Sequence, residues 1–135
     1  MSISKLYDKI KSVEEFHNVF QIGNAMDATL INEKDYTLRY NLIKEENEEY
    51  LEACKNNDIH EIADALGDQL YILFGTILKH GLQHKIEEIY DEIHRSNMSK
   101  LDENGNPIFR EDGKILKSSL YFKPNIRAVL EKNSL

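Results

Sequence analysis

Helical periodicity governs this chain from about residue 13 to residue 98, because apolar residues recur there every three or four positions and no proline interrupts them. The spacing predicts helices over about 13–21, 35–55, 59–80 and 83–98, with a separate short helical turn over 3–10. Residues 22–34 lack a clear period and are predicted to form a loop.

Local signals mark the ends of these helices. Ser12 followed by Glu15 has the spacing of a capping box at the start of the first long helix. Asn56-Asn57-Asp58 separates the second helix from the third, and Asp58 is a good N-cap. Gly81 stands where a glycine is expected to end the third helix.

The chain after Lys100 has a different texture, with glycines, both prolines and short apolar runs. The turn at Asp112-Gly113 predicts a small hairpin, and residues 125–132 predict a last short helix. The sequence as a whole predicts an all-α fold in one domain over 1–135. We expect a four-helix bundle as its body, about 1–100, and a short β-hairpin in the tail, about 101–135.

Acidic residues crowd the second predicted helix: Glu45, Glu46, Glu48, Glu49 and Glu52. Such a run is ordinarily a solvated face. At 100° per residue, however, Glu46 and Glu49 fall inside the stripe that also carries Leu42, Ile43 and Ala53. A carboxylate in an apolar stripe is costly unless a positive group meets it.

The third predicted helix repeats this anomaly. Its carboxylates lie at i, i+3 and i+7, opposite an apolar face: Glu61, Asp64 and Asp68 against Ile62, Leu66, Leu70, Leu73 and Ile77. The acidic side continues as apolar residues: Tyr71, Gly75 and Leu78. This pattern predicts a central helix whose acids face a cleft or another subunit. For Glu61 alone, a capping box with Asp58 is an alternative.

Antiparallel packing of these two helices would bring five carboxylates together in one cleft: Glu46, Glu49, Glu61, Asp64 and Asp68. They would repel each other strongly unless a cation is bound. Hard oxygen donors without His or Cys select Mg²⁺ or Mn²⁺ over zinc. Because Mg²⁺ held by carboxylates usually meets a substrate phosphate, the pattern indicates a phosphate-bearing substrate.

Charge and cysteine content narrow the class of protein. Asp and Glu outnumber Lys and Arg 24 to 17, giving a net charge of −7, which disfavours a nucleic acid polymer or an anionic membrane as partner. Cys54 is the single cysteine, so no internal disulfide forms, and a reducing cytoplasmic location is expected. The longest apolar stretch, 70–78, is far shorter than the ~20 residues of a membrane span.

The spacing of the acids resembles a known signature. Glu45-Glu46-x-x-Glu49, followed after eleven residues by Glu61-x-x-Asp64, is similar to the EExxE…ExxD pattern of the all-α nucleoside triphosphate pyrophosphohydrolases. That superfamily includes MazG, dimeric dUTP pyrophosphatases and phosphoribosyl-ATP pyrophosphohydrolase. Asn97-x-x-Lys100 and the glycine- and lysine-containing tail resemble a MazG-like subgroup.

The resemblance implies a MazG-like fold and Mg²⁺-dependent hydrolysis of a nucleoside triphosphate to a monophosphate and pyrophosphate, as in nucleotide-pool housekeeping. It implies four metal ligands: Glu46, Glu49, Glu61 and Asp64. Glu45 is then the candidate that orients or deprotonates the attacking water, and Asp68 an accessory acid near the metal.

Substrate contacts are expected from basic and amide side chains: Arg39, Asn97, Lys100, Lys114 and Lys117. Lys is a good point-charge phosphate binder. The alternatives are a solvated basic hairpin for the tail residues and a surface ion pair for Arg39. Phe16, His17, Tyr71 and Tyr121 are either packing residues or contacts to a base.

The Tyr71, Gly75 and Leu78 side of the third helix is expected to need cover, which predicts a homodimer or homotetramer. Two further functions stay open beside nucleoside triphosphate hydrolysis. One is a non-catalytic helical module that binds metal or nucleotide. The other is phosphoribosyl-ATP pyrophosphohydrolase activity, which the absence of a cyclohydrolase-like segment makes less favoured.

Overall fold

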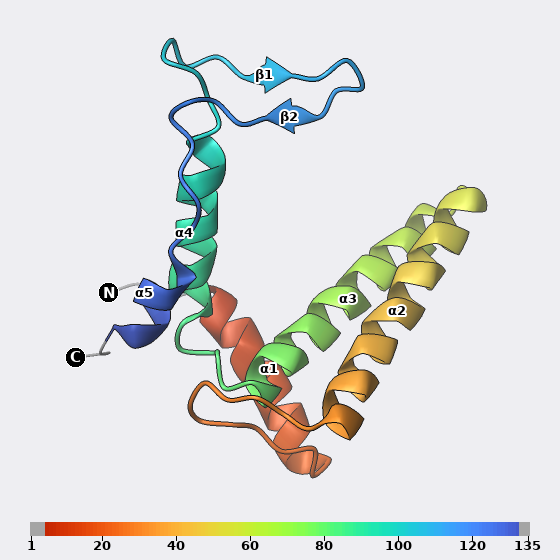
Figure 1. Cartoon of the computed structure of the whole chain (residues 1–135). Coiled ribbons are helices and arrows are strands. Elements are labelled where there is room, and N and C mark those ends of the chain that lie inside the picture. The colour runs from red at the N-terminus through yellow and green to blue at the C-terminus, as the bar shows by residue number, and fades with distance from the viewer. Residues whose placement is uncertain (1–4, 133–135) are drawn as a thin grey trace. The chain divides into compact units, whose positions relative to one another are not determined.

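The computed structural model describes residues 5–132. The described chain is mostly helical, with one small antiparallel hairpin (Figure 1). In chain order the elements are α1 (Lys5–Val19), α2 (Glu33–Lys55), α3 (Ile59–Lys79), α4 (Ile86–Met98), β1 (Ile108–Phe109), β2 (Ile115–Leu116) and α5 (Ile126–Glu131). The predicted all-α class with a C-terminal hairpin is confirmed. Contacts divide the chain into two compact units, 1–84 and 85–135.

In the first unit, α3 packs against both α1 and α2. The Asp58 side chain accepts hydrogen bonds from the backbone N–H groups of His60 and Glu61, which starts α3 as predicted. Asn32 caps α2 in the same way, accepting from the Asp35 N–H. These caps fix where the two helices begin, on either side of a turn at 56–58.

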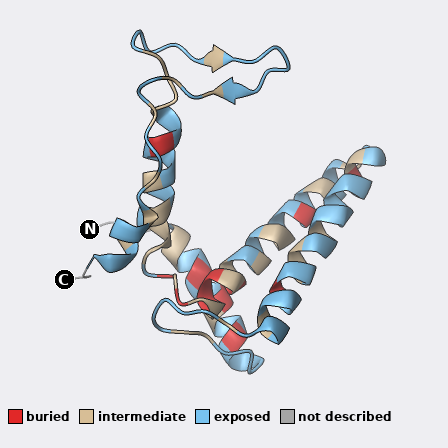
Figure 2. Cartoon of the chain, viewed as in Figure 1, coloured by how far each residue is buried: buried red, intermediate tan, exposed pale blue. Residues whose placement is uncertain are grey.

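The buried residues of the first unit gather where α1, α3 and the chain that flanks them meet (Figure 2). Ile10 and Val13 come from α1, and Ile77 and Leu78 come from α3. The loop before α2 is tied to this end of α3, because the Ala25 N–H donates to Leu78 O and the Thr29 N–H donates to His80 O. Gly81 ends the region with a φ of +66°, as a helix-ending glycine does.

A buried polar network holds the three helices at Gly75. His17 of α1 is 2% exposed and Arg39 of α2 is 8% exposed. The Arg39 guanidinium donates from Nε to Thr76 Oγ1 at 3.0 Å and from Nη2 to the Ile72 carbonyl at 2.7 Å. A Cβ atom at Gly75 would lie 2.6 Å from Arg39 Nη2 and 2.9 Å from His17 Nε2. Gly75 therefore lets both side chains approach the α3 backbone.

The second unit ties its tail to α4 through serine hydroxyls. Ser96 is buried and donates to the Phe122 carbonyl at 2.8 Å. Ser99 Oγ accepts from the Phe122 N–H, and Ser118 Oγ donates to the Ser99 carbonyl. In the hairpin, Ile108 pairs with Leu116 and Phe109 with Ile115.

The first helix differs from the prediction. It is continuous over Lys5–Val19, so the separate turn over 3–10 and the helix start near 13 are wrong where the chain is described. Ser12 does not cap: its hydroxyl donates back to the Lys9 carbonyl inside the helix at 2.6 Å. The fourth helix begins at Ile86 instead of 83, without a side-chain cap at Lys85.

The faces of α3 also differ from the prediction. Gly75 is buried and Leu78 is fully buried, and the Phe16 ring of α1 meets Tyr71, so α1 covers the side that was expected to lack cover. The exposed apolar side is the opposite one. Leu66, Leu70 and Leu73 are 45%, 54% and 47% exposed.

None of the helices within residues 5–132 combines the length and the apolar character that crossing a membrane requires.

We expect Gly75→Ala to lower the free energy of unfolding by about 1–3 kcal/mol, because the new methyl group displaces both Arg39 and His17 from a packed site. Urea unfolding measures the change. Gly67→Ala is the matched control on the same helix: a Cβ there meets no atom within 4 Å, so the variant should gain up to about 1 kcal/mol. Equal stability changes in the two variants would contradict the role of Gly75.

Candidate functional site

The acids of α2 and α3 meet where the two helices cross-connect. Arg39 bonds to Thr76, and Asn47 lies 3.5 Å from Gln69, so residue numbers rise along α2 as they fall along α3. This antiparallel register brings Glu46 opposite Asp68. Carboxylate oxygens of Glu46, Glu49 and Asp68 lie within 4.8 Å of one another, and these residues are the acid cluster.

Electrostatics in the acid cluster disfavour full ionisation. Burial raises the pKa of Glu46 to about 7, helped by a hydrogen bond with Glu49 and by the negative charges of Glu49, Asp68 and Asp64. Burial also raises the pKa of Asp68, and the charges of Asp64 and Glu49 add to this effect. The cluster holds a proton near neutral pH because three carboxylates face each other without a cationic side chain among them.

One atom of the cluster tests whether a metal ion fits. The Oε2 atom of Glu46 is buried and makes no hydrogen bond within the described chain. A buried acceptor without a donor is costly, and a bound cation would satisfy it. The donors are all carboxylate oxygens, which suit Mg²⁺ or Mn²⁺. The residues therefore fit a hard divalent cation.

The other predicted acids lie around this cluster. Asp64, one turn before Asp68 on α3, is close enough to raise the pKa of both Glu46 and Asp68. Glu61 is exposed one turn further along, and its backbone N–H donates to Asp58. The reciprocal half of a capping box is replaced, because the Asp58 N–H donates to the Ala53 carbonyl. Glu45 is exposed on α2, one turn before Glu49.

Arg39 lies in the first unit but is committed to the protein. Its two hydrogen bonds to α3 and its burial show that the surface ion-pair alternative is wrong. The residue is two turns before Glu46 on the same side of α2. It thus anchors the helix that carries the acids, and its contact with substrate stays a prediction.

The remaining predicted substrate contacts belong to the second unit. Asn97 is exposed near the end of α4, and the Lys100 N–H donates to its carbonyl. Lys114 sits in the hairpin turn, where its N–H donates to Asp112. Lys117 follows β2, with its ammonium 4.7 Å from the centroid of the Tyr121 ring. All four side chains are in a helical end and hairpin that carry positive charge, and their role stays a prediction.

Sequence reasoning missed the partners of His17 and Arg39. The His17 Nδ1 atom lies 2.8 Å from Asn24 Oδ1, and burial lowers the pKa of His17, with the hydrogen bond opposing it and the charge of Arg39 adding to it. His17 is thereby a packing residue held between a loop and α3. No local signal joins residues 17, 24, 39 and 75, since they meet only in the folded unit.

Comparison with known proteins places the chain. Residues 13–97 match the phosphoribosyl-ATP pyrophosphohydrolase family. Uncharacterized protein L479 of Acanthamoeba polyphaga mimivirus is 30% identical over 112 residues, which cover 80% of this chain and 41% of that protein. The chain thus spans about two fifths of the length of this relative. A solved structure from Exiguobacterium sp. 255-15, of a candidate NTP pyrophosphohydrolase, is 21% identical with a TM-score of 0.48, covering 93% of this chain and 92% of that one.

The fold and the acid cluster define a helical protein of the pyrophosphohydrolase class, and the family match spans well over half of the chain. The chain belongs to the phosphoribosyl-ATP pyrophosphohydrolase family. This confirms the resemblance to the all-α pyrophosphohydrolase superfamily drawn from the acid spacing. The matched segment contains every residue of the acid cluster together with Glu45, Glu61 and Asp64.

The raised pKa of Glu46 predicts a pH dependence of stability in the metal-free protein. A carboxyl group that titrates near 4.5 unfolded and about 7 folded loses stabilisation as pH rises between these values, because the folded state binds the extra proton. Glu46→Gln removes this group, so its free energy of unfolding should gain on that of the native protein from about pH 5 to about pH 8. Urea unfolding in chelator measures the difference.

Glu48→Gln, an exposed neighbour on α2, is the control and should show a difference that changes little over this range. A difference between Glu46→Gln and the native protein that stays constant with pH would contradict the shifted pKa.

Proposed function

We propose that this protein hydrolyses a nucleoside triphosphate to a nucleoside monophosphate and pyrophosphate, and that it depends on Mg²⁺, with Mn²⁺ as a substitute. The observation that carries the proposal is the acid cluster with its buried, unsatisfied Glu46 oxygen. Family membership supports pyrophosphohydrolase chemistry. The cluster adds the residues with which a divalent cation and a polyphosphate would be brought together.

Glu46, Glu49 and Asp68 would hold the metal ion, with Asp64 and Glu61 on the neighbouring turns of α3 as further ligands. When bound, Mg²⁺ offsets phosphate charge and stabilises the charge that develops on the leaving pyrophosphate. The carboxylates themselves fix where the phosphates lie, since they come from two helices locked together by Arg39. Without a cation, the same carboxylates would repel the substrate.

Glu45 has the position of a general base. Its carboxylate is exposed on α2, next to Glu46 and one turn before Glu49. It would orient a water molecule and accept its proton as the water oxygen attacks the α-phosphorus. The bond between the α-phosphorus and the bridging oxygen then breaks, and pyrophosphate leaves. Arg39, Asn97, Lys100, Lys114 and Lys117 are the proposed contacts to the substrate.

The alternatives differ in what they turn over. Phosphoribosyl-ATP would release pyrophosphate by the same bond cleavage, and the family match gives it a place in any substrate panel. A non-catalytic module would bind metal or nucleotide without releasing pyrophosphate. The acid set favours catalysis, because none of the six positions carries an amide in place of a carboxylate.

The native protein should release pyrophosphate from at least one nucleoside triphosphate when Mg²⁺ is present, and from none in chelator. Glu46→Gln and Asp64→Asn should each lower the rate about 100-fold or more, because the cation loses a ligand that stabilises the transition state. A coupled pyrophosphate assay over canonical and damaged nucleotides, with phosphoribosyl-ATP, measures the rates.

Glu48→Gln should keep the native rate, since Glu48 is exposed on the same helix outside the acid cluster. Mg²⁺ should also raise the melting temperature of the native protein, because the folded state binds it. Binding without turnover on the whole panel would favour the non-catalytic module. No turnover and no metal binding would refute the proposal.

We also propose that the chain forms a homodimer or homotetramer, through the exposed side of α3 that carries Leu66, Leu70 and Leu73. Light scattering should then give a mass that is a multiple of the 15.8 kDa chain. Leu70→Glu should shift the mass toward one chain, because a charge replaces a contact that excludes water. Leu38→Glu, at 54% exposure on α2, serves as the control, and an equal effect of both would refute this face as the interface.

A further inference from the structure

Three aromatic rings of the first unit gather on its surface. Phe16 and Phe20 come from the end of α1, and Tyr71 comes from α3. The ring centroids of Phe16 and Phe20 are 4.5 Å apart, and Phe16 meets Tyr71 edge-on at 5.6 Å. The residues are 38%, 63% and 42% exposed, so we call them the aromatic patch. Rings that contact each other yet stay exposed leave flat apolar surface toward solvent.

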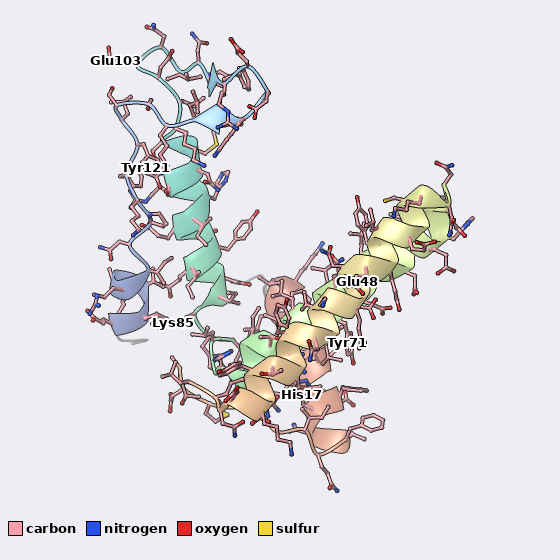
Figure 3. All side chains as sticks on the ribbon, turned by 45° about the vertical axis from the view of Figure 1, so that its right-hand side comes forward. His17, Glu48, Tyr71, Lys85, Glu103 and Tyr121 are labelled. Atoms are coloured by element: carbon pink, nitrogen blue, oxygen red, sulfur yellow. The ribbon has the colours of Figure 1, made fainter. Side chains whose placement is uncertain are left out.

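The aromatic patch lies on the same side of α3 as the acids. Tyr71 follows Asp68 by three residues and Asp64 by seven, and these intervals place all three side chains on one side of a helix. Tyr71 is labelled on α3 in Figure 3, near the middle of the paired helices. Walking along this side, the chemistry changes within one turn from carboxylates to exposed aromatic rings.

A second hollow in this unit differs from the patch. A groove of about 480 Å³ is lined by Tyr36, Tyr40 and Lys44 of α2 and by Leu73 and Thr76 of α3, among others. By helical position, Tyr40 points about 120° away from Glu46 around α2. The groove therefore opens on the other side of the seam between α2 and α3, and it provides matched tyrosines that do not neighbour the acids.

We propose that the aromatic patch holds the flat aromatic base of the substrate while the acid cluster engages its phosphates. This inference rests on the proposed function, and it states that the substrate class is nucleosidic, so that a base-free polyphosphate is bound by the cation site alone. Stacking suits the patch because every nucleobase has a π-face, and no charged side chain is needed. Tyr71 links the two parts, since it is in contact with Phe16 and is one turn from Asp68.

The test measures affinity apart from turnover. The native protein is titrated with α,β-methylene-ATP, in which the scissile bridge is blocked, and separately with inorganic tripolyphosphate, both with Mg²⁺. Tyr71→Leu should weaken binding of α,β-methylene-ATP about 5- to 100-fold, because one stacking surface is lost. Its affinity for tripolyphosphate should stay at the native value. Tyr71→Phe keeps the ring and should bind both ligands as the native protein does.

Tyr40→Leu is the matched control, at 64% exposure on the other side of the seam, and should leave both affinities unchanged. Phe20→Leu repeats the test from α1 in case Tyr71→Leu unfolds, which circular dichroism reports. Equal binding of α,β-methylene-ATP by Tyr71→Leu and Tyr71→Phe, or native affinities that are equal for the two ligands, would overturn the inference. Absence of pyrophosphate release in a protein that passes this test refutes only the proposed function.

Discussion

Mutual repulsion among carboxylates is the constraint on which this structure turns. Glu46, Glu49 and Asp68 stand within 4.8 Å of one another, and their charges oppose the packing of the helices that carry them. The neighbouring contacts supply the opposing stabilisation: Arg39 reaches from α2 to two groups of α3. The apolar contacts of α1 with α3 then hold α3 in place. A scaffold that forces acids together in this way stores a preference for a cation.

The sequence predicted those parts of the fold that local rules decide. Asp58 caps α3 as its position indicated, and α2 and α3 end close to the predicted residues. The assignment of Glu46 to the buried stripe followed from the helical repeat alone, and its Oε2 atom is buried. Periodicity was sufficient here because the acids broke a pattern that their neighbours defined.

Other parts depend on which surfaces meet, and a single sequence does not say this. The pattern of α3 is apolar almost all round, so it could not tell whether Leu78 or Leu70 would be covered. The structure buries Leu78 under α1 and leaves Leu70 half exposed. Ser12 misled for a related reason, since its hydroxyl bonds inside the helix as readily as at its start. The contacts of His17 with Asn24 and Gly75 join residues far apart in the chain.

The family match divides the proposed site. Residues 13–97 include all the acids and the aromatic patch, whereas Lys100, Lys114 and Lys117 lie beyond the match. The division agrees with the two compact units only in part, because α4 belongs to the matched segment and to the second unit. Cation binding and base stacking therefore rest on the segment shared with the family, while contacts from the hairpin are peculiar to this chain. Substrate preference within the family is then expected to vary with the tail, and the bond that is cleaved is expected to stay the same.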